Sequence, residues 1–146
     1  MKKIDSPIVV NKIFHSPMEI VWEAITELEK MHQWYFENIP SFKPEVGFKT
    51  QFNIQSGERN FLHIWEVLEV IPNKLIKYNW KYEAYPGDSN VMFELFDEND
   101  YTKLILTVDI LEDFPEDIPE FNRESCIGGW EYFIKDRLKN YLGSVR

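Results

Sequence analysis

Between Gly47 and Ile110 the chain alternates apolar and polar residues with the period of two that is typical of β-strands. Residues 75–82 show this most clearly, because Ile, Tyr, Trp and Tyr alternate with Lys and Asn. In residues 61–71 both parities are partly apolar, so the facing of that strand is ambiguous. Short turn sequences separate the strands and leave no room for crossover helices, which predicts an antiparallel meander.

One strand and two helices are expected before this meander. Residues 8–14 are β-branched and aromatic, which predicts the first strand. Ser16, Pro17 and Glu19 then form a helix-start signature, with Ser16 as the expected cap and Glu19 completing a capping box. A short second helix is expected near residues 30–35. The apolar stripe of the first helix consists of Val21, Trp22, Ile25 and Leu28.

A long helix is predicted from about Phe121 to Leu142, with Gly143 as its stop signal. Gly128 and Gly129 lie inside it, at a cost of roughly 1 kcal/mol each relative to alanine. Either they leave room for a ligand or a loop, or they allow close packing on the sheet or a kink. The expected buried stripe consists of Ile127, Trp130, Ile134, Leu138 and Tyr141.

Composition limits the classes of protein to consider. The 146 residues are 44% hydrophobic and 16% aromatic, which is enough for a sizeable core in one domain, 1–146. A net charge of −9 without clustered Lys or Arg argues against nucleic acid and anionic membranes as partners. Cys126 is the only cysteine, and neither a signal peptide nor a membrane span is recognisable. We therefore expect a cytoplasmic protein.

Several motifs, in their order along the chain, resemble the START-like (SRPBCC) superfamily. They are residues 14–22 (FHSPMEIVW), Trp34, 44–47 (PEVG), 65–72 (WEVLEVIP), 75–80 (LIKYNW), 102–104 (TKL) and the helix 129–142. The similarity is greatest to the branch named for the activator of the ninety-kilodalton heat-shock protein ATPase, specifically that protein's C-terminal-type domain. The resemblance implies an α+β helix-grip fold, in which a curved antiparallel sheet of six or seven strands surrounds a long C-terminal helix. Two short helices should follow the first strand.

The resemblance leaves several functions open. The superfamily includes lipid carriers, polyketide cyclases, stress proteins and co-chaperone domains. One residue departs from the family pattern, since Trp65 stands where the strand usually carries glycine before Val67. This ring should narrow a pocket or move its mouth.

Signals for catalysis are sparse. The three histidines are scattered, no spacing fits a metal site, and no nucleophile elbow or phosphate loop is present, so we expect no cofactor and no metal. His63 alternates with Phe61 and Trp65; it is either the acid or base of a cyclase-type enzyme, beside Tyr78, or a hydrogen-bonded strand histidine. Cys126 has no flanking His or Lys and is expected to be a buried, inert thiol.

The apolar residues expected between the sheet and the C-terminal helix are the better candidate site. Ligand pockets are mostly apolar and aromatic with a few polar anchors, and this group has that composition. It consists of Trp34, Phe48, Phe52, His63, Trp65, Tyr78, Trp80, Phe93, Leu106, Trp130 and Phe133. Either these side chains surround a cavity, or they interlock as a solid core.

Three functional hypotheses follow. The first is a non-enzymatic domain that binds a small hydrophobic or aromatic molecule. The second is a chaperone-associated stress protein, acting by surface contact through its acidic face and an exposed Trp34 and Tyr35. The third is a cyclase or hydrolase that uses His63.

The acidic, proline-containing segment 112–120 should lie beside one end of the cavity. Its carboxylates must stay in water, whereas Phe114 and Ile118 are apolar. We expect one or both of these side chains to fold inward as a cap. The alternative is a solvated connection in which Phe114 fills a surface niche.

Overall fold

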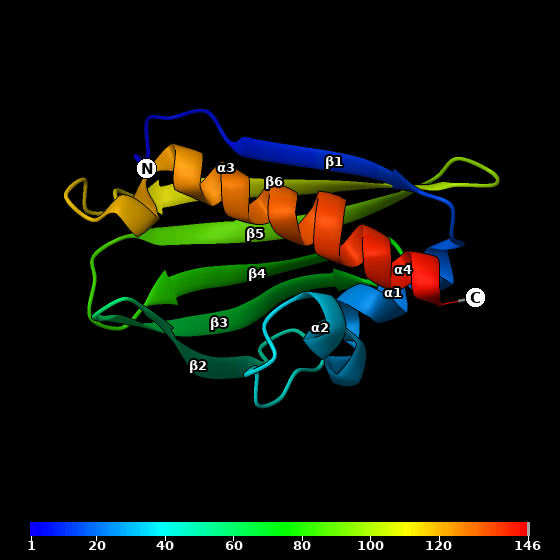
Figure 1. Cartoon of the computed structure of the whole chain (residues 1–146), viewed down its shortest axis with the longest axis horizontal. Helices are drawn as coiled ribbons and strands as arrows, with labels where there is room; N and C mark the ends of the chain where they lie inside the picture. Colours follow the sequence, from blue (N-terminus) through cyan, green and yellow to red (C-terminus); the bar gives the residue numbers. More distant parts are fainter. Residues whose placement is uncertain (146) are drawn as a thin grey trace.

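The computed structural model describes residues 1–145 and contains a six-stranded antiparallel sheet with a long helical segment across one face (Figure 1). The strands are β1 (Ile8–Phe14), β2 (Lys49–Ser56), β3 (Arg59–Ile71), β4 (Leu75–Tyr82), β5 (Asp88–Asp97) and β6 (Thr102–Glu112). Their order in the sheet is β1-β6-β5-β4-β3-β2, so β1 and β2 form the edges. The predicted α+β helix-grip fold is confirmed.

Each of the four hairpins between β2 and β6 turns through one residue with positive φ. These residues are Gly57 (φ 60°), Asn73 (φ 65°), Gly87 (φ 118°) and Asn99 (φ 68°). Glycine and asparagine tolerate this region of backbone space better than other residues. Local turn chemistry therefore accounts for the meander that the sequence predicted.

Strand β3 contains an irregularity that explains why its facing was ambiguous. From Phe61 to Val67 the odd-numbered side chains are buried. The register with β4 then shifts between Val67 and Glu69, after which Val70 packs against the core. A bulge inserts one residue and so switches the parity of the alternation, which makes both parities partly apolar.

Two short helices, α1 (Met18–Thr26) and α2 (Leu28–Trp34), follow β1 as expected, but the expected capping box was wrong. Pro17 is the N-cap of α1, and no side chain caps the helix. The carbonyl of Ser16 instead accepts a hydrogen bond from the hydroxyl of Thr102 at 2.6 Å. A tertiary contact with β6 thus fixes the chain where it enters α1.

The terminal helical segment lies across the inner face of the sheet (Figure 1). Its first full helix begins at Arg123 because the side chain of Asn122 accepts a hydrogen bond from the amide of Ser125 at 2.8 Å. The segment consists of η1 (Pro119–Phe121), α3 (Arg123–Glu131), the π-helical η2 (Tyr132–Leu138) and α4 (Lys139–Ser144).

The π-helical stretch keeps one row of apolar residues facing the sheet. The buried residues are Trp130, Ile134, Leu138 and Leu142, each four positions after the last. In an α-helix of 3.6 residues per turn, such a row drifts by about 40° at each step. A π-helix turns less per residue, which offsets the drift. The predicted stripe is corrected at its ends, because Ile127 and Tyr141 are only half-buried.

Candidate ligand-binding site between the sheet and the terminal helix

A cavity of about 150 Å³ lies between the inner face of the sheet and the terminal helical segment; we call it the interior cavity. Its lining residues are Met1, Phe36, His63, Trp80, Tyr82, Glu120, Phe121, Ser125, Cys126, Gly129, Trp130 and Phe133. A second void of about 50 Å³ extends to Phe114 and shares five lining residues with the first: Met1, Trp80, Tyr82, Cys126 and Trp130. Aromatic rings form most of the wall.

Only part of the group predicted from the sequence lines this cavity: His63, Trp80, Trp130 and Phe133. The other members pack against one another in the core, namely Trp34, Phe48, Phe52, Trp65, Tyr78, Phe93 and Leu106. The ring of Trp65 packs against the rings of Phe52, Tyr78 and Trp80, with centroid distances of 4.8–5.1 Å. The space between sheet and helix is therefore mostly solid, with a small cavity at one end.

Eight of the twelve lining residues were missing from the group proposed from the sequence, and three of these eight are aromatic. Tyr82 shares the parity of Tyr78 and Trp80 on β4, so the alternation alone contained the signal for it. Phe36 follows α2 in an irregular segment, where no periodicity indicates its direction. Phe121 lies in the short η1, at a position that only the tertiary structure brings to the cavity.

The expected exposure of Trp34 and Tyr35 was wrong. Trp34 is 0% exposed and Tyr35 is 3% exposed. The indole Nε1 of Trp34 donates a hydrogen bond to the carbonyl of Ala24 at 2.7 Å, and the two rings stack with centroids 4.5 Å apart. Neither side chain is available as a contact surface for a chaperone.

Tyr35 also forms a buried polar contact with β4. Its hydroxyl lies 2.8 Å from the hydroxyl of Tyr78, deep in the aromatic core. Burial raises the pKa of both phenols, so both stay protonated at neutral pH. One hydroxyl donates a hydrogen bond to the other. Within residues 1–145, neither hydroxyl has a second hydrogen-bond partner.

Replacing both tyrosines of this pair is expected to cost less than the two single replacements added together. Tyr35→Phe or Tyr78→Phe leaves one buried hydroxyl without a partner, which costs about 1–3 kcal/mol of unfolding free energy. The double variant removes both polar groups, so its loss should be smaller than the sum of the two single losses. Urea denaturation of the four proteins gives this double-mutant cycle. Additive losses would contradict the buried pair.

His63 brings a hydrogen-bond acceptor to the cavity wall. The side chain is 5% exposed, and its Nδ1 lies 2.9 Å from the carbonyl of Phe61. A carbonyl oxygen only accepts, so Nδ1 carries the hydrogen and Nε2 has a free lone pair. Desolvation lowers the pKa of His63 to about 4, although the bond to Phe61 opposes this shift. The ring is neutral at physiological pH.

Tyr82 provides a donor close to this acceptor. Its hydroxyl accepts a hydrogen bond from Nε1 of Trp80 at 2.9 Å, which leaves its own hydrogen to donate. Burial raises the pKa of Tyr82, so the phenol stays protonated. The rings of His63 and Tyr82 are 4.8 Å apart between centroids. Acceptor and donor thus belong to adjacent side chains of the cavity wall.

Cys126 adds a weakly polar group to the same wall. Burial raises the pKa of its thiol to about 11, so it stays protonated at neutral pH. The residue is half-buried rather than fully buried as expected, and the inertness of its thiol stays a prediction. Glu120 lies near the entrance. A hydrogen bond from its own backbone, one from Ser56 at 2.8 Å and the charge of Arg59, 3.3 Å away, lower the pKa of its carboxyl group, so it is charged.

Gly129 lies at the exposed side of the cavity. A Cβ atom at either Gly128 or Gly129 would meet no described atom within 4 Å, so the close-packing interpretation of this pair was wrong. Gly129 lines the cavity, whereas Gly128 is exposed elsewhere on the helix. The absence of a side chain at Gly129 keeps this part of the wall open.

The acidic segment caps one end of the aromatic interior, as expected. Phe114 is 3% exposed, and its ring lies 5.4 Å from that of Phe121 and 6.1 Å from that of Tyr82. Its amide donates a hydrogen bond to the carbonyl of Met1 at 2.9 Å. Ile118 is half-buried against the core. The carboxylates stay at the surface.

The structure offers no candidate metal centre in residues 1–145. No three His, Cys, Asp or Glu side chains in this range are placed to hold a metal ion. Among the same residues, no helix has both the length and the apolar character needed to cross a bilayer.

Solved structures of several bacterial proteins share this fold. Protein MLL2253 from Mesorhizobium loti has a TM-score of 0.76 and 26% identity, over 97% of this chain and 99% of its own. CalU16 from Micromonospora echinospora has a TM-score of 0.68 and 22% identity, over 93% of this chain and 75% of its own. DynU16, a protein of the dynemicin biosynthetic locus, has a TM-score of 0.76 and 23% identity; the match covers 96% of this chain but 48% of DynU16. Comparison with curated proteins finds no match.

One family model covers most of the sequence. It is described as "Activator of Hsp90 ATPase homolog 1-like protein" and matches residues 15–143. The matched range extends from the end of β1 through the terminal helix, so it includes both walls of the interior cavity. The chain is therefore a START-like domain and belongs to the family of Activator of Hsp90 ATPase homolog 1-like proteins.

Proposed function

We propose that the chain binds a small, uncharged aromatic molecule between the sheet and the terminal helix. The observation that carries this proposal is the pair formed by the acceptor Nε2 of His63 and the donor hydroxyl of Tyr82 inside a ring-lined cavity. Apolar walls with a few convergent polar groups are typical of ligand sites. Such a wall binds a ring by contact and orients it by the two polar atoms.

The volume of the cavity limits the ligand to about one ring. Drug-sized ligands occupy pockets of about 300–1,000 Å³, and the interior cavity has about 150 Å³. An engineered apolar cavity of about 150 Å³ in another protein holds benzene. A phenol fits both the size and the polarity, because its hydroxyl donates to His63 and accepts from Tyr82.

The charges around the site select against anionic ligands. His63 is neutral at physiological pH, and the one cationic group among the lining residues, the α-ammonium of Met1, already donates a hydrogen bond to the carbonyl of Phe121 at 3.0 Å. Glu120 lies near the entrance, and the acidic segment 112–120 lies beside it. Burying an unpaired carboxylate there would cost several kcal/mol. Phenol should therefore bind more tightly than benzoate.

Binding rather than catalysis is the function that this geometry favours. A general base works best when its pKa lies near the operating pH. The pKa of His63, about 4, makes it a weak base at neutral pH. The same neutral imidazole is a good hydrogen-bond acceptor for a hydroxyl group.

Gly129→Leu is expected to weaken phenol binding at least about tenfold, since a leucine side chain would occupy the entrance of the interior cavity. Gly128→Leu is the matched control, because it adds the same side chain to the same helix without lining the cavity. Both changes favour the helix, so neither should reduce stability. Phenol titrations followed by Trp fluorescence and NMR chemical shifts measure the effect. Equal affinity of the two variants, or benzoate binding as tightly as phenol, would contradict the proposal.

Contact with a chaperone is a second candidate function, which the family match favours. The contact surface would have to be one other than Trp34 and Tyr35, since both side chains are buried. Stimulation of the ATPase activity of Hsp90 by the purified chain tests this function. Unchanged ATPase activity at saturating protein would rule it out.

A further inference from the structure

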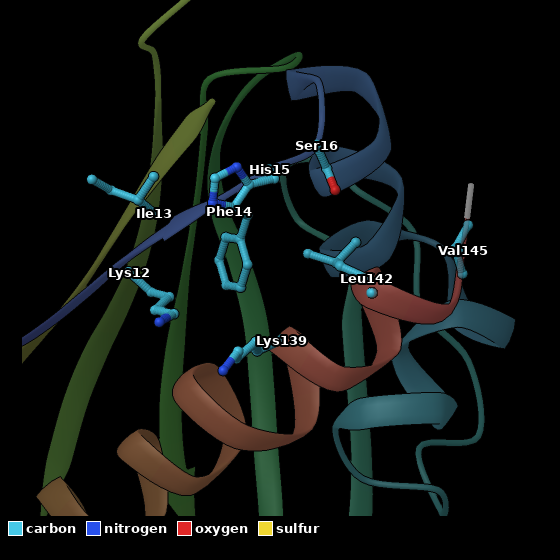
Figure 2. Close-up of a pocket in the computed structure, with 9 residues that line it drawn as sticks. Lys12, Ile13, Phe14, His15, Ser16, Lys139, Leu142 and Val145 are labelled. Carbon is cyan, nitrogen blue, oxygen red and sulfur yellow. The ribbon is translucent and has the colours of Figure 1, made fainter. Parts of the chain in front are cut away.

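A groove of about 460 Å³ lies between β1 and α4, away from the interior cavity (Figure 2); we call it the terminal groove. The two hollows share no lining residue. One wall comes from β1 and the turn that follows it, and the other from the end of the terminal helix. The lining residues are Lys12, Ile13, Phe14, His15, Ser16, Lys139, Leu142, Gly143 and Val145.

Lys12 occupies an unusual place in β1. The strand alternates, with Ile8, Val10 and Phe14 buried on the inner face of the sheet. Lys12 has the same parity and is half-buried, so its ammonium group extends from the inner face towards the terminal helix. A charge on the inner face of an edge strand protects against pairing with other chains. That role alone requires no second lysine opposite it.

Lys139 provides the second positive charge. Figure 2 shows the side chains of Lys12 and Lys139 extending into the groove from opposite walls. The residues that line the groove include no Asp or Glu, and no ion pair within residues 1–145 involves either lysine. Like charges repel each other. In a chain with a net charge of −9, two facing ammonium groups without a carboxylate are a local excess of positive charge.

The remainder of the groove is apolar with one hydroxyl group. Phe14 and Leu142 are buried and form its floor, while Ile13 is exposed at the rim. The hydroxyl oxygen of Ser16 faces the groove in Figure 2. The volume lies within the range of about 300–1,000 Å³ that is usual for small-molecule sites.

We infer that the terminal groove binds a small amphipathic anion, with its carboxylate or phosphate head group between Lys12 and Lys139 and its apolar chain on Phe14 and Leu142. The anion removes the repulsion between the two ammonium groups, and its chain covers the apolar floor. This site prefers the ligands that the interior cavity rejects. The two sites therefore differ in the charge of the molecules they accept.

Octanoate, octyl phosphate, octanol and inorganic phosphate are the probes. Isothermal titration calorimetry measures affinity, and NMR chemical shifts locate the binding site. Octanoate or octyl phosphate should bind with shifts centred on Phe14 and Leu142, and whichever of the two binds more tightly identifies the head group. Octanol and inorganic phosphate should each bind at least about tenfold more weakly, because each lacks one half of the recognised chemistry.

Lys12→Met and Lys139→Met keep the aliphatic stem and remove the charge. Each should weaken binding of the amphipathic anion about tenfold, and the double variant should weaken it further. Lys135→Met is the matched control: it removes the same charge from the same terminal helical segment, but Lys135 pairs with Glu131 at 3.2 Å and does not line the groove. Its affinity should equal that of the unmodified chain.

Several outcomes would overturn the inference. One is a double variant, Lys12→Met with Lys139→Met, that binds the anion as tightly as the unmodified chain does. The others are that octanol binds as tightly as octanoate, or that neither octanoate nor octyl phosphate binds. Shifts centred on His63 would place the anion in the interior cavity and also contradict it. Gly129→Leu, which tests the interior cavity, should leave anion binding unchanged. The two sites can therefore fail or succeed separately.

Discussion

Gly87→Ala is expected to reduce the free energy of unfolding by about 2–5 kcal/mol. Gly87 has φ 118°, a backbone conformation that residues with a side chain rarely adopt. A methyl group there would also overlap the ring of Phe114, with Cγ at 2.6 Å and Cε1 at 2.7 Å. Strained backbone costs about 1–3 kcal/mol, and overpacking costs a similar amount. Urea denaturation at neutral pH measures the loss.

Gly57→Ala is the matched control for this change. Gly57 also has positive φ, 60°, but a Cβ atom there would meet no described atom within 4 Å. The Gly57→Ala variant should lose only the unfolding free energy that backbone strain costs, about 1–2 kcal/mol. A loss at Gly87 no larger than that at Gly57 would show that the ring of Phe114 does not press on this turn.

Gly87→Ala is also expected to affect ligand binding in the interior cavity. Phe114 lines the smaller void beside it and packs on Phe121, which lines the cavity itself. A displaced Phe114 opens that end of the aromatic interior to water. Gly87→Ala should therefore also weaken phenol binding, although Gly87 does not line the cavity.

Acidification is expected to destabilise the fold through His63 by about 2 kcal/mol between pH 7 and pH 5, and by about 3 kcal/mol at pH 4. The folded protein binds this proton with a pKa of about 4, whereas the unfolded chain binds it near the ordinary value of 6.5. Between these values the unfolded state binds more protons. The stability that the buried neutral ring contributes is thus present above pH 6.5 and is lost as the pH falls to about 4.

His63→Phe provides the comparison, because it keeps an apolar ring and cannot titrate. Surface carboxylates contribute equally to both proteins, so the difference between their pH profiles isolates His63. Unfolding free energies from urea denaturation at several pH values give the two profiles. Parallel profiles from pH 7 to pH 4 would contradict a buried, neutral His63.

Much of the fold was predictable because its signals are local. The alternation of β4, β5 and β6 indicates which side chains point inward, and a glycine or asparagine with positive φ turns each hairpin. The inward fold of Phe114 also followed from local chemistry, since carboxylates remain in water and an aromatic ring does not. These features depend on neighbours in the sequence, so they can be read from it.

The candidate site was only partly predictable. Parity placed Trp80 on the inner face, but it left the facing of β3 ambiguous and did not distinguish His63 from Trp65, which has the same parity on that strand and is packed solid. Whether an inward side chain lines a cavity depends on the volumes of rings that arrive from other elements. Phe36 and Phe133 come from such elements, and no local pattern specifies how closely they approach.

The sequence by itself determined the order of strands and helices, the inner face of most strands and the closing helix, because periodicity and turn chemistry act over a few residues. Only the tertiary structure decided the parity switch in β3, the path of the chain at Ser16 and the place of Gly129 in the cavity wall. It also brought Lys12 and Lys139 to one groove from opposite ends of the chain. These outcomes depend on the shape and charge of surfaces that become neighbours only when the sheet closes around the helix.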